Sequence, residues 1–411
     1  MPTTGSDGLI MPARFVEVSD LTDDEYERWR NLADASLEPN VSFEPDLLIP
    51  ADRHVLGDHE LTLVIVGDGE RFNGLLPLRT VDKWQGIPIK VLTSRLDDEV
   101  VPVLPILGTP LLRPECAADA MSALLVAAGE LARRRRAGFL VLERLNSDGP
   151  TAELIGRTCA MHKRPSYSYA HWEKPVFSRR DGQDYRAETL HRERMRDLAK
   201  KERRLARITG SPVTVSDRDQ DPLAVEDFLR IEASGWKGEG GTAMALDPRL
   251  SAFFHDSCSR LSVASRHHLL TLEAGSRPIA MSWCVESGNG LFLLRICHDD
   301  NYGKFSPGGQ LEVATVEFFH RSTRATIIDP CCAPTNTFHA HFLPDRSPMA
   351  SSIIAVGGLS SRAFIGLFPF VAALWRRARS ARTRLASKAV TLHGKEDAEP
   401  NAQDASIEEA V

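Results

Sequence analysis

The stretch GLFLLRICHDDNYGKFSPGGQLEVATVEFFHRSTRATIIDP, residues 290–330, decides the fold class of this chain. It begins as an apolar strand, passes through a loop that ends in Ser-Pro-Gly-Gly at 306–309, and continues as a helix and a second short strand. The first N–H groups of a helix have no partner inside the helix, and the helix dipole makes that end positive. Since glycines also let a ligand approach the backbone closely, the turn predicts a binding site for a phosphate or pyrophosphate.

The same turn has a plain structural interpretation. Ser306 is a common helix cap and Pro307 is favoured in the first helical turn, so the four residues would equally serve as a simple helix start. The order of the elements around the turn favours the binding site. We also expect Gly308 and Gly309 to need positive φ angles, which other residues adopt poorly.

Length, charge and cysteine content limit the class of protein. A chain of 411 residues predicts about two to three domains, and its net charge of −6 gives no general attraction for nucleic acid. The seven cysteines form no Cys-x-x-Cys pair, which favours a reducing cytosol over a disulfide framework or a zinc site. No secretory signal pattern and no membrane-spanning apolar run of about 18 residues are visible. We therefore expect a cytoplasmic protein.

Two halves of the chain show the same order of elements: helices, a run of strands, a helix and a strand. We predict an α/β (α+β) fold of two tandem domains, each a mixed sheet flanked by helices. The segment 108–114, which enters the long helix of the first half, lacks a Gly-Gly turn, so we expect a ligand site in the second half alone. The predicted segments are a flexible N-terminus (1–12), an N-terminal domain (13–175), a C-terminal domain (176–362), a basic amphipathic segment (363–390) and a disordered acidic tail (391–411).

Three motifs carry a resemblance to a known family. They are EASGWKG at 232–238, YGKFSPGG at 302–309, and DPCCA at 329–333 followed by Pro-Asp-Arg at 344–346. Together with the basic helix before them, they resemble the GNAT acyltransferase superfamily. The similarity is greatest to its branch around the cellulose-biosynthesis protein CelD and more distant to the FemAB-type peptidoglycan transferases.

The resemblance implies a tandem pair of GNAT-like folds and an acyl donor, acetyl-CoA or another acyl-CoA, with no metal. It implies N-acyl transfer to an amine of a small-molecule or cell-envelope or polysaccharide precursor. Two alternatives stay open: a FemAB-type aminoacyl transferase that uses tRNA, and a degenerate pair that binds CoA or a partner as a scaffold. The donor would be held by the turn and its one cation, which are Lys304, Ser306, Pro307, Gly308 and Gly309.

Three residues at strand ends or in the loop are candidates for proton transfer. Asp329 ends the strand after the helix and would act as a base or hold the acceptor's ammonium group, although Asp-Pro also commonly starts a turn. His298 ends the preceding strand and titrates near neutral pH, with an exposed loop histidine as the alternative. Tyr302 is a candidate acid for the leaving thiolate.

The acceptor site is predicted from two other segments. Trp236 and Lys237 lie in a glycine-bounded loop that would clamp a phosphate or the acceptor, or merely pack on the helices. Asp345 and Arg346 would bind the acceptor or form a surface ion pair. His339 and His341 alternate on one face of an extended segment, but no third metal ligand is evident, and we predict no metal.

Two basic segments complete the prediction. The helix over 185–208 would meet the CoA 3′-phosphate, an anionic acceptor or RNA, or simply present a solvated face. The segment 363–388 joins apolar and aromatic residues to a run of arginines, which fits a peripheral anchor at the inner face of the membrane or a last helix packed on the domain. The sequence leaves the acceptor, the acyl chain and the oligomeric state open.

Overall fold

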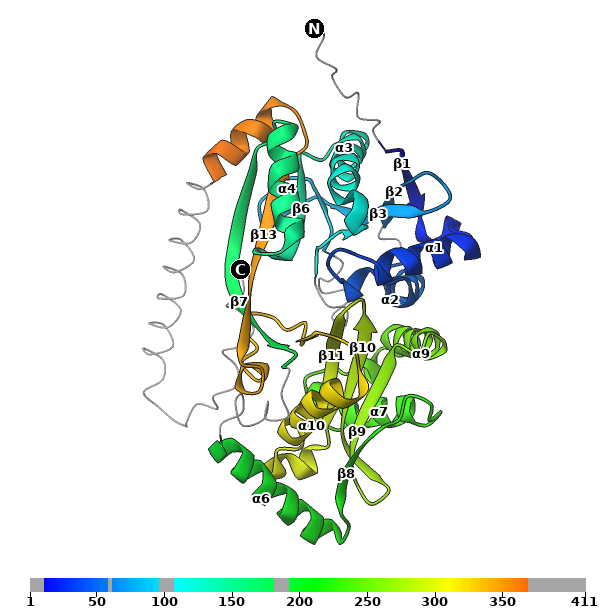
Figure 1. The fold of residues 1–411 in the computed structure, drawn as a ribbon, viewed down its shortest axis with the longest axis vertical. Coiled ribbons are helices and arrows are strands. Elements are labelled where there is room, and N and C mark those ends of the chain that lie inside the picture. The colour runs from blue at the N-terminus through cyan, green and yellow to red at the C-terminus, as the bar shows by residue number, and fades with distance from the viewer. Residues whose placement is uncertain (1–10, 58–60, 96–106, 181–191, 369–411) are drawn as a thin grey trace.

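A computed structural model describes residues 11–57, 61–95, 107–180 and 192–368. Most of the predicted flexible N-terminus and the whole acidic tail lie outside these ranges. The chain folds into one large mixed sheet flanked by helices, so the predicted α/β class is confirmed. In Figure 1 the first half, coloured blue to cyan, lies above the second half, coloured green to yellow.

The first half builds an antiparallel run of strands that ends in one parallel pair. The order β1-β2-β3-β4 is antiparallel throughout, and β6 then joins β4 in parallel after the crossover through α3. A capping box between Thr22 and Glu25 starts α1, as the Thr-x-x-Glu pattern requires. The bounds are β1 (Ala13–Glu17), α1 (Asp23–Asp34), α2 (Pro45–Ala51), β2 (Thr62–Gly67), β3 (Phe72–Val81), β4 (Val91–Thr93), β5 (Leu111–Leu112), α3 (Ala117–Arg135), β6 (Phe139–Asn146) and α4 (Pro150–Met161).

The second half repeats this plan. Strands β8 to β11 form an antiparallel run, and β12 joins β11 in parallel after the crossover through α10. The bounds are α6 (Arg192–Thr209), β8 (Val213–Asp217), α7 (Ala224–Ala233), α8 (Trp236–Glu239), α9 (Pro248–Val263), β9 (His267–Ala274), β10 (Arg277–Ser287), β11 (Gly290–His298), α10 (Pro307–Ser322) and β12 (Ile327–Asp329). The predicted strand–turn–helix–strand order of residues 290–330 is therefore present.

The two halves exchange their last strands. The strand that follows α4, β7 (Ser166–Ser178), pairs with β12 of the second half, and the strand that ends the second half, β13 (Asp345–Ala355), pairs with β6 of the first. These two strands also pair with each other along most of their length. Figure 1 shows both running beside the two halves. Each half of the sheet is thus completed by the other half of the chain.

The start of the predicted membrane segment is packed on the protein. A helix over 359–368 follows β13, and its Ile365 and Phe368 are 4% exposed each. The Phe368 ring lies 5.5 Å from that of Trp84 and 5.1 Å from that of Tyr167, centroid to centroid. These side chains are therefore not available to a bilayer, and the rest of the segment lies outside the described residues. None of the helices formed by described residues is long and apolar enough to cross a membrane.

His268 makes the stability of the second half depend on pH. It lies between β8 and β10, where Nδ1 donates to Asp217 at 2.7 Å and Nε2 to Glu286 at 3.1 Å. Burial disfavours the imidazolium, but the two carboxylates prevail and raise the pKa of His268 to about 9. A raised folded-state pKa contributes stability that is complete below the unfolded value near 6.5 and is lost as the pH rises through about 9.

We predict that His268→Gln destabilises the protein below pH 6.5, by on the order of 3 kcal/mol, because about 2.5 pH units separate the two pKa values. The difference between variant and wild type should shrink as the pH rises through 9. Urea unfolding of both proteins at pH 6, 7.5 and 9.5 measures it. A difference that stays the same at all three values would contradict the assignment of a charged His268.

Candidate active site

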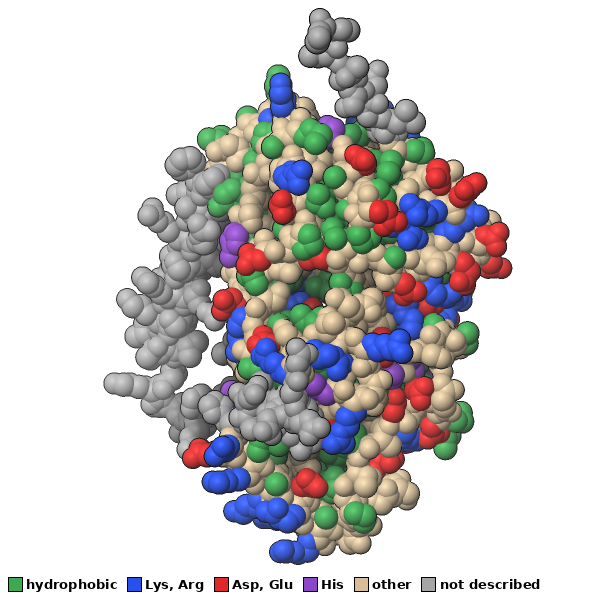
Figure 2. Space-filling view, viewed as in Figure 1, with side chains coloured by type: hydrophobic (Ala, Val, Ile, Leu, Met, Phe, Trp, Pro, Cys, Tyr) green, Lys and Arg blue, Asp and Glu red, His purple; other side chains and the backbone are tan. Residues whose placement is uncertain are grey.

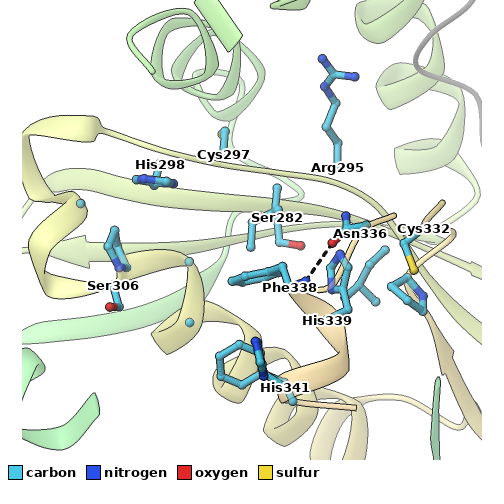
Figure 3. Close-up of a pocket in the computed structure, with 18 of the residues that line it drawn as sticks. Ser282, Arg295, Cys297, His298, Ser306, Cys332, Asn336, Phe338, His339 and His341 are labelled. Atoms are coloured by element: carbon cyan, nitrogen blue, oxygen red, sulfur yellow. Dashed lines mark hydrogen bonds between the residues drawn. The ribbon is translucent and has the colours of Figure 1, made fainter. Parts of the chain in front are cut away.

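A cavity of about 1500 Å³ opens where two parallel strands part. Strand β11 pairs with β12 only from Gly290 to Phe292, opposite Ile327–Asp329. Beyond these pairs, residues 293–298 of β11 and 330–333 after β12 both line the cavity. Helix α6, the start of α10 and the segment 336–342 close its other sides. The separation of β11 from β12 therefore creates the site, and Figure 3 shows part of its lining.

A β-bulge marks the middle of the cavity wall. Trp283 of β10 is opposite Arg295 and the next residue, Cys284, is opposite Leu293, so Leu294 is left without a partner in this pair of strands. A bulge interrupts the ladder and changes the direction of the strand, and bulges are common beside active sites. Leu293, Leu294 and Arg295 all line the cavity. Backbone groups of β11 are thereby exposed at this point to whatever the cavity binds.

The predicted turn forms the end of the cavity at the start of α10. Ser306, Pro307, Gly308 and Gly309 all line it, and Lys201 of α6 donates a 2.9 Å hydrogen bond from Nζ to Ser306 Oγ. Lys201 Nζ also pairs with Asp197 of α6 at 2.7 Å, so the positive charge that it adds to the partial charge of the helix N-terminus is shared with one carboxylate. The arrangement can hold an anion between a side-chain ammonium group and backbone N–H groups.

The expected backbone conformation of the two glycines is wrong. The residue with a positive φ is Ser306, at 53°, whereas Gly308 and Gly309 lie inside α10. A Cβ on Gly309 would lie 3.1 Å from Phe342 and 3.4 Å from Leu198, so Gly309 is needed for packing. A Cβ on Gly308 would meet its nearest atom at 3.7 Å and has room. Substitution at Gly308 therefore tests ligand access more cleanly than substitution at Gly309.

A buried charge cluster lies behind β11. The carboxylate of Glu232, 1% exposed, accepts from Lys237 Nζ at 3.2 Å, from Arg295 Nε and from the Met244 N–H at 2.8 Å. Burial opposes its charge, but Arg295 and Lys237 hold the pKa of Glu232 below its ordinary value. Lys237 lines the cavity, yet it also donates to the Ile296 carbonyl at 2.8 Å, so it ties Glu232 to β11. Burial and the nearby Arg295 lower the pKa of Lys237.

The proton-transfer candidates separate in space. His298 lines the cavity beside Ser306 and contacts Asp300 at 3.2 Å from Nε2. Tyr302 and Lys304 are not among the lining residues. The Tyr302 ring instead lies under the Arg277 guanidinium at 5.2 Å, and Lys304 Nζ lies 5.2 Å from the centre of the Phe305 ring.

Asp329 is buried beside β7 rather than exposed to the cavity. It is 8% exposed, forms an ion pair with Lys174 of β7, and accepts from the Cys331 N–H at 2.8 Å. The hydrogen bond from the Cys331 N–H belongs to the turn that the Asp-Pro sequence also predicts. Asp329 therefore holds β12 to β7.

The predicted acceptor residues at 345 and 346 also make structural contacts. Asp345 accepts from Arg180 at 2.5 Å and from the Ser178 N–H at 2.8 Å, and these contacts outweigh burial and lower the pKa of Asp345. Arg346 donates to the carbonyl oxygens of Leu343 and Asp345, both at 2.8 Å. Trp236 begins α8, and its side chain lies outside the description. The structure thus gathers Lys237, His298 and the four turn residues at the cavity, and it puts Tyr302, Lys304, Asp329, Asp345 and Arg346 elsewhere.

Several lining residues were not assigned to the site from the sequence. Arg194, Leu198 and Lys201 follow the spacing i, i+4, i+7 on α6, so one face of this basic helix points to the cavity. This helical spacing is the sequence feature that could have assigned the three residues to the site, but the many arginines on the other faces of the helix obscure it. His339 and His341 also line the cavity, but the described residues hold no group of three or more side chains that could bind a metal.

A family model matches part of the second half of the chain. Residues 192–330 match the family model described as an acetyltransferase (GNAT) domain. These residues therefore form a GNAT domain, and the predicted superfamily is confirmed, while the CelD-like branch stays a prediction. No curated protein matches the chain.

Solved structures give weak overall similarity. The C-terminal domain of a putative lysylphosphatidylglycerol synthetase from Agrobacterium fabrum has a TM-score of 0.49 at 11% identity, covering 83% of this chain and 94% of that one. FemX gives 0.49 at 11% identity, with 78% and 88% covered. A tandem GNAT protein from the clavulanic acid biosynthesis pathway gives 0.42 at 14% identity, with 84% and 99% covered. The assignment rests on the family model and not on these scores.

We predict that Asp329→Asn destabilises the fold. The change leaves the buried ammonium group of Lys174 without its counter-charge, and breaking a buried pair in this way typically costs about 3–5 kcal/mol. The double variant Asp329→Asn with Lys174→Met should recover part of the loss because no unpaired charge remains. Urea unfolding of the three proteins decides. If the Asp329→Asn protein is stable and binds an acyl donor but no longer transfers the acyl group, Asp329 takes part in catalysis after all.

Proposed function

We propose that this protein transfers an acyl group, acetyl in the simplest case, from acyl-CoA to an amine of a small-molecule or envelope-precursor acceptor. The observation that carries the proposal is the position of the cavity. It lies within and beside the matched GNAT domain, at the parting of β11 from β12 and against the start of α10.

The charges around the start of α10 suit the phosphates of CoA. Lys201 already reaches Ser306, and the N–H groups at the start of α10 would bind pyrophosphate oxygens. Arg192 and Arg194 of α6 line the same cavity and can pair with a further phosphate group. Lys304, the cation expected in this role, lies against Phe305 instead, and Lys201 takes its place in the proposal.

The rest of the cavity suits the acyl end of the donor. A donor bound at the start of α10 and extending along β11 would reach the bulge at Leu294, where the hydrogen-bond ladder between β10 and β11 is interrupted. Backbone N–H groups directed at a thioester oxygen would stabilise the negative charge that develops there during attack by an amine. Apolar side chains of Ile296, Phe338 and Phe342 line the path and would exclude water from it.

The first half of the chain supports a single donor site. Its parallel pair of β4 and β6 stays in contact one residue past the last strand pair, and a later segment then packs on β6. The Gly108 N–H donates to the Glu143 carbonyl at 2.7 Å, and the Ser94 N–H donates to the Val141 carbonyl at 3.2 Å. A Cβ on Gly108 would lie 2.4 Å from the Glu143 oxygen, so the two backbones are in direct contact. We propose that this half supports the fold and the acceptor side rather than binding donor.

One observation favours the aminoacyl-transferase alternative. Lys200, Arg203, Arg204 and Arg207 of α6 are exposed, and Figure 2 shows Lys and Arg side chains gathered at the lower end of the molecule, where α6 lies in Figure 1. A basic helix beside the cavity would suit the phosphates of a tRNA donor. Thermal shifts with acetyl-CoA, CoA and tRNA separate the two donors, since the true ligand stabilises by RT ln(1 + [L]/Kd).

We predict that Lys201→Met weakens acetyl-CoA binding about 10- to 100-fold. The change removes one charge-assisted hydrogen bond, worth about 1.5–3 kcal/mol, while it keeps the apolar stem of the side chain. Gly308→Val should weaken binding as well, because its side chain would stand where the ligand approaches α10. Lys200→Met is the matched control, since Lys200 is exposed on the same helix and does not line the cavity. Calorimetric titration measures all four proteins.

The outcomes separate the alternatives. No binding of acetyl-CoA or CoA by the wild type at millimolar concentration would refute the CoA-dependent proposal, and stabilisation by tRNA would then favour aminoacyl transfer. Tight binding that is equal in wild type, Lys201→Met and Gly308→Val would put the donor elsewhere. Donor binding without transfer to any amine would support the scaffold alternative.

A further inference from the structure

His339 and Glu312 form a buried pair at the wall of the cavity. The imidazole Nδ1 lies 2.9 Å from Glu312 Oε1, and the two residues are 6% and 1% exposed. Glu312 comes from α10, whereas His339 comes from the segment after β12, so the cavity wall brings the two together. Figure 3 shows His339 among the lining side chains, and its ring centre is 5.2 Å from that of Phe338.

The hydrogen bond fixes which nitrogen of His339 is available. A carboxylate can only accept, so Nδ1 carries the proton and Nε2 of the neutral ring has a free lone pair. No described residue bonds to Nε2, and this atom is not among the buried polar atoms without a partner, so it is accessible from the cavity. The available nitrogen can therefore accept a proton from a bound molecule.

The second oxygen of Glu312 points to the same conclusion. Oε2 is buried and has no hydrogen-bond partner among the described residues. A buried carboxylate with one hydrogen bond is poorly compensated, and a positive charge on the adjacent imidazole would compensate it. The pair is therefore built to stabilise His339 after it has taken up a proton, as a carboxylate does for a histidine base in other enzymes.

The pair lies next to the bulge that would hold the reacting carbonyl. Glu312 is close enough to Cys284 that, after burial, its charge contributes to raising the pKa of that thiol to about 12. Cys284 is opposite Leu293, at the edge of the bulge. Glu312 also lies one turn along α10 from Gly308, on the same face. The pair thus lies one helical turn from the start of α10, and His339 lines the same cavity as the bulge.

We propose that His339 is the general base of acyl transfer and that Glu312 positions it. The proposal rests on the function proposed above. Nε2 of His339 takes one proton from the acceptor's ammonium group, and the resulting amine attacks the thioester carbonyl. The C–N bond forms, the C–S bond breaks, and the second amine proton goes to the leaving thiolate, which departs as CoA thiol. His339 then releases its proton to water.

The kinetic test uses release of CoA thiol from acetyl-CoA, with L-lysine, glucosamine, putrescine and water as acceptors. His339→Ala should lower kcat about 10²- to 10⁴-fold, the usual contribution of a base, while calorimetry shows unchanged affinity for acetyl-CoA. Added imidazole should restore part of the rate, because it can occupy the space and accept the proton. Glu312→Gln should lower kcat less, again with unchanged donor affinity. His255→Gln is the control, since it alters an exposed His–Glu pair between α9 and α7, away from the cavity.

A second readout does not depend on turnover. Diethyl pyrocarbonate modifies accessible neutral imidazole, so peptide mass spectrometry should find His339 carbethoxylated in the free protein and protected by acetyl-CoA.

Three outcomes would overturn the proposal. One is a folded His339→Ala protein with wild-type kcat. Another is a lowered kcat that imidazole does not restore, accompanied by weaker donor binding, because a structural role would do both. The third is an unmodified His339 in the free protein. A wild type that releases no thiol with any acceptor refutes the proposed function together with the base, whereas activity that survives in His339→Ala refutes the base alone.

Discussion

The pairing of β7 with β13 in the middle of the sheet determines where every functional element lies. Because each of these strands also completes the opposite half, β12 is held from one side by β7 and from the other by only three residues of β11. The ion pairs of Lys174 with Asp329 and of Arg180 with Asp345 secure this junction. With β12 fixed, β11 can diverge from it without unravelling the sheet, and the cavity is the space that this divergence leaves.

The two halves use one plan with opposite results. Both have an antiparallel run, a crossover helix and a short parallel pair. In the first half, Ser94 continues the contact of β4 with β6, and Gly108 bonds to β6 beyond it, so backbone polar groups satisfy one another there. In the second half, the corresponding opening is walled by side chains from α6 and the segment 336–342. Beyond Phe292, the backbone N–H and C=O groups of β11 that face away from β10 have no partner on β12, and a ligand with peptide-like groups can bind there.

Local sequence patterns predicted the order of the helices and strands, but they gave wrong roles to residues whose partners are distant in the sequence. The strand–turn–helix–strand order of residues 290–330 follows from glycine, proline and apolar periodicity within some 40 residues, and it was predicted correctly. Asp329 was assigned to the site as a strand end and Asp345 through a motif of the resemblance, but their partners, Lys174 of β7 and Arg180 just after it, lie 155 and 165 positions away. No local pattern encodes an exchange of strands. His339 and Glu312 were missed as a pair for the same reason, since they lie 27 positions apart with a whole strand between them.

Helix α6 shows how the site depends on packing as well as on charge. It supplies Arg192, Arg194 and Lys201 to the cavity, yet its buried anchors are just Leu198 and Leu205. Donor affinity must include the free energy of holding this helix in place, because a binding-competent state that is partly populated weakens apparent affinity in proportion. The contact of Lys201 with Ser306 reduces that cost by joining α6 to α10 before the donor arrives. In the proposed function, the same lysine would both pair with an anionic group of the donor and preorganise the surface that receives it.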